Sequence, residues 1–431
     1  MAADAQAPRV WDTAYEFKAV GLLTVGFGLV GLDRWILPPL FPSMMKDLSL
    51  NYQDLGNLVG ALGVAWGVSA IVMGNLSDRF GRRRVLVPAV VLFSLLSLFT
   101  GLATGLVSLL LIRGLMGAAE GAVAPTGVAT AVEASHPKRR GLTNGAFQCA
   151  FALFGLAVAP ILATQLLKYM SWHYIFMLVA IPGLIVAGLM WLTIREPVTV
   201  AKAEGAKAPR APISALFKHR NVGLAMVGLL CAMTGIFVIS AIMPNYLTDF
   251  LKLSPQQMGF VTSAIGFGGF LGQLGLPALS DLLGRRTVAL ASFALASAFL
   301  WLFIHTGVNM PVLFGLLFFA SMFNFGALAL IAGPIAAEAA PIGLMASVAG
   351  IVIGAGEIFG GGVAPSIAGG IAQHYGIQYT LYFALAGQVL GLILCLFFKE
   401  TAPGKAKSSK VGEVSELDQL EQAHPGGVTV K

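Results

Sequence analysis

Twelve runs of mostly apolar residues, each roughly 18 to 25 residues long, account for most of this chain. Since about 20 apolar residues in a helix cross a hydrocarbon core of about 30 Å, each run predicts one membrane-spanning helix. With 57% hydrophobic and 11% charged residues, the chain is too apolar for an ordinary soluble protein, so we predict an all-α protein embedded in a lipid bilayer. The approximate limits of the runs are 18–41, 55–75, 85–104, 107–131, 143–167, 174–193, 221–247, 256–280, 287–306, 311–336, 345–372 and 378–398.

The longest polar interruption, residues 194–220, separates six predicted spans from six. We therefore predict an N-terminal half at 18–193, a cytoplasmic linker at 194–220 and a C-terminal half at 221–398. The polar segments 1–17 and 399–431 are expected to be a cytoplasmic N-terminus and a cytoplasmic tail.

The positions of Lys and Arg residues predict the orientation. If both termini are cytoplasmic, the outer loops hold only Lys46, Lys168 and Lys252, and the inner loops hold many arginines. The positive-inside rule then predicts a multi-pass protein of the inner or plasma membrane with both termini cytoplasmic. The same rule accounts for the net charge of +7 without a nucleic-acid partner.

Chemistry-bearing motifs are scarce in this sequence. Cys149, Cys231 and Cys395 lie far apart inside apolar runs, which supports neither a disulfide framework nor a metal site. No G-x-S-x-G, H-E-x-x-H or phosphate-loop pattern occurs, so we expect neither an enzyme nor a bound cofactor.

Two loops of the chain are copies of one another. "GNLSDRFGRRR" (74–84) lies between predicted spans 2 and 3, and "PALSDLLGRRT" (277–287) lies between spans 8 and 9. The two align without gaps at a spacing of 203 residues, which indicates two related halves. Two parallel halves joined by a linker are typical of transporters that alternate access by rocking around a midplane site. The identical pairs include Ser77 and Ser280, Asp78 and Asp281, Gly81 and Gly284, Arg82 and Arg285, and Arg83 and Arg286.

The first of these loops resembles the signature loop of the major facilitator superfamily, G-x-x-x-D-R-x-G-R-R. The resemblance covers residues 18–398 and implies a monomeric transporter of twelve helices in two six-helix halves. It also implies a conformational gate, whose charge contacts hold one conformation and break in another; the alternative is that the arginines only anchor the orientation. The matching residues are Gly74, Asp78, Arg79, Gly81, Arg82 and Arg83, and the second copy repeats Asp281, Gly284, Arg285 and Arg286 but has Pro277 and Leu282 at two of the signature positions.

A few ionisable residues lie well inside the predicted spans, where each charge costs about 2.5 to 3.5 kcal/mol. Such residues are expected to face a cavity or a partner. The acids can be neutralised by a proton whereas the arginines cannot, so we expect the acids to carry protons and the arginines to act as fixed cations. These residues are Asp33, Arg34, Arg113, Glu120 and Glu357.

The "DR" pair in span 1 and "RGLMGAAEGAVAP" (113–125) in span 4 resemble the anion:cation symporter family, which includes sialin and bacterial sugar-acid transporters. That resemblance implies proton-coupled import of an organic anion such as a sugar acid or an aromatic or aliphatic carboxylate. It assigns Asp33 and Glu120 to proton coupling and Arg34 to the substrate carboxylate. It makes Arg113 an ion-pair partner near the substrate; a purely structural ion pair with Asp33 or Glu120 is the alternative.

Glu357 departs from that resemblance, which leads us to expect an uncharged polar residue in its place. It is expected to be a further proton site, to bind a cationic or hydroxyl-rich part of the substrate, or to be neutral through burial. Gln148, Trp35 and Asn324 are further candidates for binding substrate, with packing roles as the alternative. Glu338, near an inner end, is expected to reach water.

A proton-coupled exporter of drugs or cations is the main alternative, because intramembrane acids serve it equally well. Against it, Arg34 and Arg113 would repel a cation, and "FGLAVAPILA" in span 5 only partly resembles the exporter pattern. A channel is less well supported, because a repeated gate loop has no evident purpose there.

Overall fold

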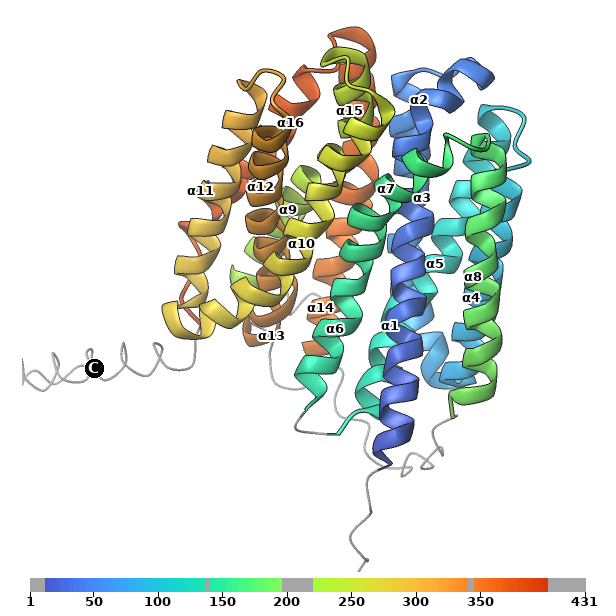
Figure 1. Ribbon diagram of the computed structural model, residues 1–431. Helices are drawn as coiled ribbons and strands as arrows, with labels where there is room; N and C mark the ends of the chain where they lie inside the picture. The colour runs from blue at the N-terminus through green and yellow to red at the C-terminus, as the bar shows by residue number, and fades with distance from the viewer. Residues whose placement is uncertain (1–11, 137–138, 196–219, 340–344, 402–431) are drawn as a thin grey trace, which may run out of the picture.

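The computed structural model describes residues 12–136, 139–195, 220–339 and 345–401. Within these ranges all regular elements are helices, some of them with π-helical turns, labelled η (Figure 1). Most of the predicted linker and most of both predicted termini lie outside the described residues, so their boundaries stay predictions.

The N-terminal half comprises α1 to α8. Its elements are α1 (Thr13–Trp35), α2 (Leu37–Leu48), α3 (Tyr52–Phe80), α4 (Arg82–Thr100), α5 (Leu106–Ala134), α6 (Arg140–Ala152), η2 (Leu153–Val158), α7 (Ala159–Leu166) and α8 (Trp172–Thr193).

The C-terminal half comprises α9 to α16. Its elements are α9 (Arg220–Asn245), η4 (Tyr246–Phe250), α10 (Pro255–Leu283), α11 (Arg285–Ile304), α12 (Met310–Leu330), η5 (Ile331–Ile335), α13 (Ala336–Ala339), α14 (Met345–Ala355), η6 (Gly356–Val363), α15 (Ala364–His374) and α16 (Tyr379–Cys395).

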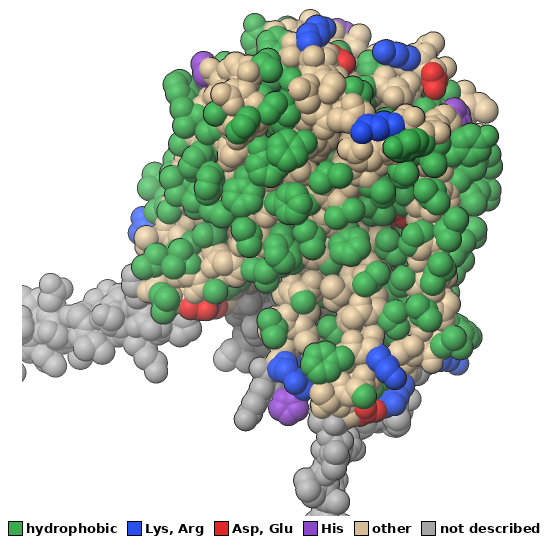
Figure 2. All heavy atoms as spheres, viewed as in Figure 1, with side chains coloured by type: hydrophobic (Ala, Val, Ile, Leu, Met, Phe, Trp, Pro, Cys, Tyr) green, Lys and Arg blue, Asp and Glu red, His purple; other side chains and the backbone are tan. Residues whose placement is uncertain are grey.

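Eleven helical stretches of the described residues are long and apolar enough to cross a membrane, and α16, with 17 residues, is a shorter apolar twelfth. Figure 2 shows a broad apolar band on the visible face, with charged side chains gathered at the two ends. These features confirm the prediction of an all-α, multi-pass membrane protein.

The first predicted span, 18–41, is two helices. α1 begins at Thr13, because the Asp12 side chain accepts a hydrogen bond from the Tyr15 N–H (3.0 Å) and caps the helix start. α2 begins after Ile36, and Pro38 and Pro39 stand near its start. Proline lacks an N–H and is tolerated in the first turn of a helix, so the pair separates the two segments.

The bundle has two ends, which we name by their residues. The tyrosine end carries Tyr52 at the start of α3, Tyr169 after α7 and Tyr375 after α15. It is the end where α2 lies, at the top of Figure 1. The arginine end carries the two repeated loops with Arg82 and Arg285.

The halves contact each other where α3 packs on α15 and η6, and where α10 packs on η2 and α7. Glycines make the first contact close. A Cβ atom added to Gly56 of α3 would lie 3.0 Å from the Cα atom of Gly369 in α15, which is tighter than nine in ten real contacts of a Cβ atom. The backbones of the two halves therefore touch directly at the tyrosine end.

Candidate functional site

Asp33 and Arg34 occupy the last turn of α1, directly before the break at Ile36. Their exposed fractions are only 1% and 3%, and every α1 residue from Gly26 to Trp35 is buried. Both charges therefore lie in the interior of the bundle, as their position in an apolar run predicted.

The Asp33 side chain points into the N-terminal half. The Ser97 hydroxyl of α4 donates a hydrogen bond to its carboxylate (2.8 Å), and Arg113 Nη1 of α5 donates to the Asp33 backbone carbonyl (3.3 Å). Among the described residues, Arg113 forms this backbone contact in place of the expected ion pair with Asp33 or Glu120. The last carbonyls of a helix lack an intrahelical donor, which explains why the guanidinium is directed there.

Arg34 points toward the C-terminal half. Its Nη2 lies 3.1 Å from the Glu357 carboxylate, which is 323 positions away in the chain. The guanidinium carbon lies 4.6 Å from the ring centre of Phe237, 5.7 Å from Trp35 and 5.9 Å from Trp66. Its Nε and Nη1 are buried and have no hydrogen-bond partner among the described residues. The guanidinium fork therefore keeps donors that match a planar anion such as a carboxylate.

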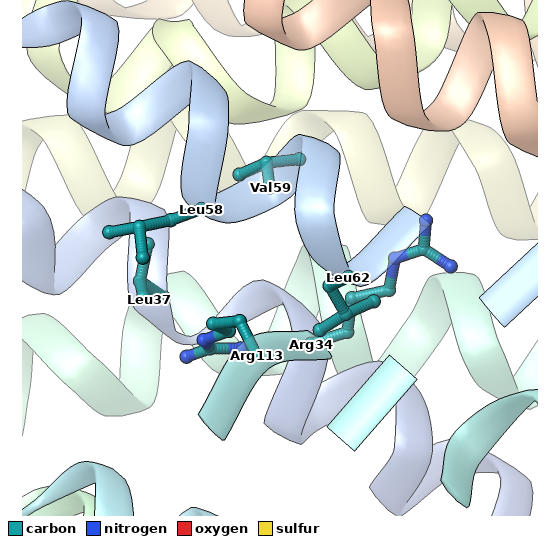
Figure 3. A pocket seen from close by; sticks show the side chains of 6 residues that line it. All are labelled: Arg34, Leu37, Leu58, Val59, Leu62 and Arg113. Carbon is teal, nitrogen blue, oxygen red and sulfur yellow. The ribbon is translucent and has the colours of Figure 1, made fainter. Parts of the chain in front are cut away.

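A small cavity lies between Arg34 and Arg113. Figure 3 shows the two guanidinium groups directed to opposite sides of it. Its remaining walls are aliphatic, so the cavity combines fixed positive charge with an apolar surface. The lining residues are Arg34, Leu37, Leu58, Val59, Leu62 and Arg113.

Glu120 lies on α5, two helical turns from Arg113. Its side chain is fully buried, and neither carboxyl oxygen has a hydrogen-bond partner among the described residues. An ionised carboxylate is costly in such surroundings, whereas a carboxyl group that has taken up a proton carries no charge to bury.

The other expected site residues fall in different places. Trp35 packs 5.3 Å from Phe237, and its indole N–H has no partner among the described residues. Gln148 is exposed on α6, and no contact between described residues joins it to Arg34. Asn324 of α12 lines a separate small cavity with Ser321. The structure thus brings Trp35, but neither Gln148 nor Asn324, into contact with the surroundings of Arg34.

The repeated loops at the arginine end adopt the same backbone. Gly81 has φ 100° and ψ 149°, and Gly284 has φ 101° and ψ 145°. Each glycine ends a 29-residue helix and begins the next one. A positive φ strains residues that carry a Cβ atom, which explains the glycine in both copies.

Arg82 ties the first loop to its own half. Its Nη1 donates to the Ser77 hydroxyl (2.7 Å), and its Nη2 donates to Glu133 at the end of α5 (3.0 Å). Gly74 lies in α3, and Arg79 is exposed, while the Asp78 side chain is outside the part of the chain that the structure describes.

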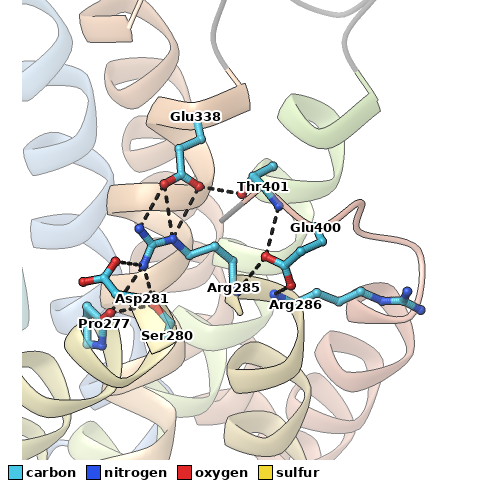
Figure 4. A network of polar contacts seen from close by, with 8 residues as sticks. All are labelled: Pro277, Ser280, Asp281, Arg285, Arg286, Glu338, Glu400 and Thr401. Carbon is cyan, nitrogen blue, oxygen red and sulfur yellow. Dashed lines mark hydrogen bonds and ion pairs between the residues drawn. The ribbon is translucent and has the colours of Figure 1, made fainter. Parts of the chain in front are cut away.

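Arg285 makes the equivalent contacts in the second loop (Figure 4). Its Nη1 donates to the Ser280 hydroxyl (2.6 Å) and its Nη2 to Glu338 of α13 (3.0 Å), while Asp281 forms an ion pair with it (2.6 Å). Glu338 therefore binds this arginine and is also exposed, in keeping with the expectation that it reaches water. Glu133 therefore belongs to the same half as Arg82, and Glu338 belongs to the same half as Arg285.

Arg83 and Arg286 are also equivalent. Arg83 donates to the carbonyl of Trp191 near the end of α8 (3.2 Å), and Arg286 donates to that of Leu396 directly after α16 (2.8 Å). In the second half, Glu400 accepts hydrogen bonds from the first two N–H groups of α11 (2.8 and 3.2 Å) (Figure 4). Each loop thus fastens together the helices of its own half.

At the tyrosine end, hydrogen bonds join the two halves. The Tyr52 hydroxyl donates to Asp249 (2.8 Å), the Tyr52 N–H donates to Gln373 (3.3 Å), and Gln53 donates to the Ser366 carbonyl (3.0 Å). The hydrogen bonds that join two described residues across the halves lie at this end or at Arg34 and Glu357. This structure is therefore closed at the tyrosine end.

Sequence reasoning missed three neighbours of the charged pair: Ser97, Trp66 and Phe237. Each is a single hydroxyl or aromatic residue in an apolar run, and no spacing separates it from ordinary packing residues. Glu133 and Glu400 were missed as well.

Comparison with known proteins identifies relatives along almost the whole chain. A probable 4-methylmuconolactone transporter of Cupriavidus pinatubonensis is 28% identical, over 86% of this chain and 88% of its own length. A D-galactonate transporter of Escherichia coli is 24% identical, over 84% of this chain and 90% of its own length. Both are transporters, in agreement with the prediction that the chain is a transport protein and not an enzyme.

The fold has solved counterparts. The crystal structure of the nucleoside transporter NupG matches with a TM-score of 0.72 at 15% identity, covering 89% of this chain and 99% of NupG. The family model of the Major Facilitator Superfamily matches residues 23–246 and 225–425, which together span both halves. The chain therefore belongs to the Major Facilitator Superfamily.

Proposed function

We propose that this protein is a proton-coupled symporter that imports an organic carboxylate by alternating access. The observation that carries the proposal is the buried Arg34 guanidinium, which has two nitrogens without partners among the described residues and belongs to a residue that lines a small cavity with aliphatic walls. A carboxylate supplies the planar pair of acceptors that such a fork binds. The substrates after which the two relatives are named, 4-methylmuconolactone and D-galactonate, support an organic acid.

The charges around this site favour coupling to protons. Asp33, Glu120 and Glu357 outnumber Arg34 and Arg113 by one, so the cluster is negative when every group is ionised, and a bound anion adds to that charge. Uncompensated charge is costly in the interior of a protein. Protons on the acids offset it, so we propose that anion and protons are carried together, with Asp33, Glu120 and Glu357 as the coupling residues.

The positive-inside rule places the arginine end in the cytoplasm, so both termini are cytoplasmic and the tyrosine end faces outward. We propose a monomer in the inner or plasma membrane, with the linker 194–220 between its halves. In that orientation the present structure is closed to the outside. The two repeated loops make equivalent contacts, each within its own half. These contacts would keep each half rigid while the halves rock against each other.

The function is tested by uptake into proteoliposomes that hold the purified protein. A panel of radiolabelled acids, including 4-hydroxybenzoate and D-galactonate, is offered with and without an inward proton gradient. Accumulation of at least one acid that depends on the gradient, and collapses on addition of a protonophore, supports the symporter. Uptake that ignores the gradient for every acid would count against it.

One observation favours an exporter of cations as the second candidate. The Glu357 carboxylate already neutralises Arg34, so the repulsion of a cation by that arginine is weaker than its charge alone suggests. Proton-driven efflux of a cationic dye from the same proteoliposomes, with no response to any acid, would identify the exporter.

A further inference from the structure

Glu357 and Arg34 form a buried contact between the two halves of the protein. Their side chains are 7% and 2% exposed, and a single carboxylate oxygen lies 3.1 Å from a single guanidinium nitrogen. Glu357 stands in the π-helical segment η6, which is wedged between α3 and α9. π-helical turns inside helices are frequent at functional sites.

This contact occupies only part of the Arg34 fork. A guanidinium offers five N–H donors, and a carboxylate binds it best through two parallel bonds. Glu357 uses Nη2 alone, while Nε and Nη1 have no partner among the described residues. A free carboxylate that bound in the two-bond manner through Nη2 would have to take the place of the Glu357 oxygen.

A displaced Glu357 has no other cation to bind among the described residues around it. The elements packed against it contribute uncharged groups, namely Gly67 of α3 and Met233 and Phe237 of α9. Arg34 of α1 is the cation acting on it, and Glu120 of α5 acts as a like charge. A charged carboxylate without a partner is costly in such a site.

We propose that Glu357 occupies the place of the substrate carboxylate on Arg34 in the empty protein, and that anion binding moves Glu357 away and puts a proton on it. This inference rests on the proposed symporter function. One O–H bond forms on Glu357, with a proton from the side that supplies the anion. The same bond breaks when the anion leaves on the other side and Glu357 returns to Arg34, so one proton accompanies each anion through this residue.

Calorimetric titration of the purified protein tests the exchange. 4-Hydroxybenzoate and D-galactonate are titrated in two buffers of different ionisation enthalpy, which yields the affinity and the protons taken up per bound anion. The wild type is expected to take up about one proton more per anion than Glu357→Gln. Glu357→Gln is expected to bind about ten-fold more tightly, because the competing carboxylate is gone.

Glu357→Asp is the control for a folding defect in Glu357→Gln. It keeps a carboxyl group at this position, so it should keep the proton uptake. If Glu357→Gln binds with the wild-type affinity and proton count, the exchange is wrong while the symporter stands. If neither acid binds to the wild type, the symporter fails as tested and the exchange falls with it.

Discussion

Gly63 of α3 offers the sharpest test of how the halves close at the tyrosine end. A Cβ atom at this position would lie 2.7 Å from the carbonyl carbon of Gly361 and 2.9 Å from the Cα atom of Gly362, both in η6. In Gly63→Ala both separations must grow beyond 3.0 Å, because real Cβ atoms essentially never come closer than that to another atom. The atoms in the way are backbone, so they cannot rotate aside.

The size of the effect follows from the geometry. Overpacking of this kind costs about 1 to 3 kcal/mol. Alanine also gains about 1 kcal/mol of helix propensity over glycine, but it gains this in every conformation. The clash is confined to the conformation closed at the tyrosine end, so the ratio of open to closed protein should rise about 5-fold to 150-fold without loss of the fold.

Spin labels report the change directly. Tyr169 and Tyr375 are 82% and 75% exposed and lie on opposite halves at the tyrosine end, so cysteines there accept labels without disturbing the core. Pulsed electron resonance should show a larger population of long distances in Gly63→Ala than in Gly188→Ala, whose Cβ would meet nothing within 4 Å. Identical distance distributions in the two variants would refute the proposed closure by backbone contact.

Three further predictions concern single side chains. Arg285→Ala should lower the free energy of unfolding in detergent by about 2 kcal/mol, whereas Arg140→Ala, at an exposed arginine, should leave it unchanged, because the Arg285 side chain is 9% exposed and pairs with Asp281 and Glu338. Tyr52→Phe removes one hydrogen bond between the halves, so it should shift the spin-label distances in the same direction as Gly63→Ala by about 1 kcal/mol. Glu120→Gln removes a proton-carrying carboxyl group, so net uptake driven by the proton gradient should be lost while exchange of labelled for unlabelled anion continues.

The parts of the fold set by local rules could be predicted from the sequence. Apolar runs predicted the helices because a bilayer demands about 20 apolar residues per crossing. The spacing of 203 residues between the loops predicted related halves, and Gly81 and Gly284 have almost the same φ and ψ. The break at Ile36 was missed although Pro38 and Pro39 mark it, because hydropathy alone runs through it.

Contacts between distant segments could not be predicted in the same way. Nothing in the spacing of Arg34 and Glu357 indicates that they meet, since their contact depends on how η6 packs between α3 and α9. The burial of both residues in apolar runs showed only that each needed a partner. The π-helical turns likewise depend on packing, because one extra residue per turn leaves no periodic mark in the sequence.

The partners of the repeated arginines were missed although the sequence holds a weak signal for them. Glu133 and Glu338 each precede an alanine at the end of a predicted span, in "VEAS" and "AEAA". Glu133 and Glu338 are 205 residues apart, two more than the spacing of 203 between the loops, so the ungapped alignment of the loops does not place them at equivalent positions. Glu400 accepts hydrogen bonds from the first N–H groups of α11, and no contact among the described residues of the first half corresponds to these bonds.

The central claim is that Arg34 binds the carboxylate of the substrate. Its most direct test is proton-driven uptake of the preferred acid by the wild type, Arg34→Ala and Arg140→Ala in proteoliposomes, the last being an exposed arginine at the start of α6. The account predicts that uptake is lost in Arg34→Ala and unchanged in Arg140→Ala, with both variants folded. Full uptake by Arg34→Ala would contradict it.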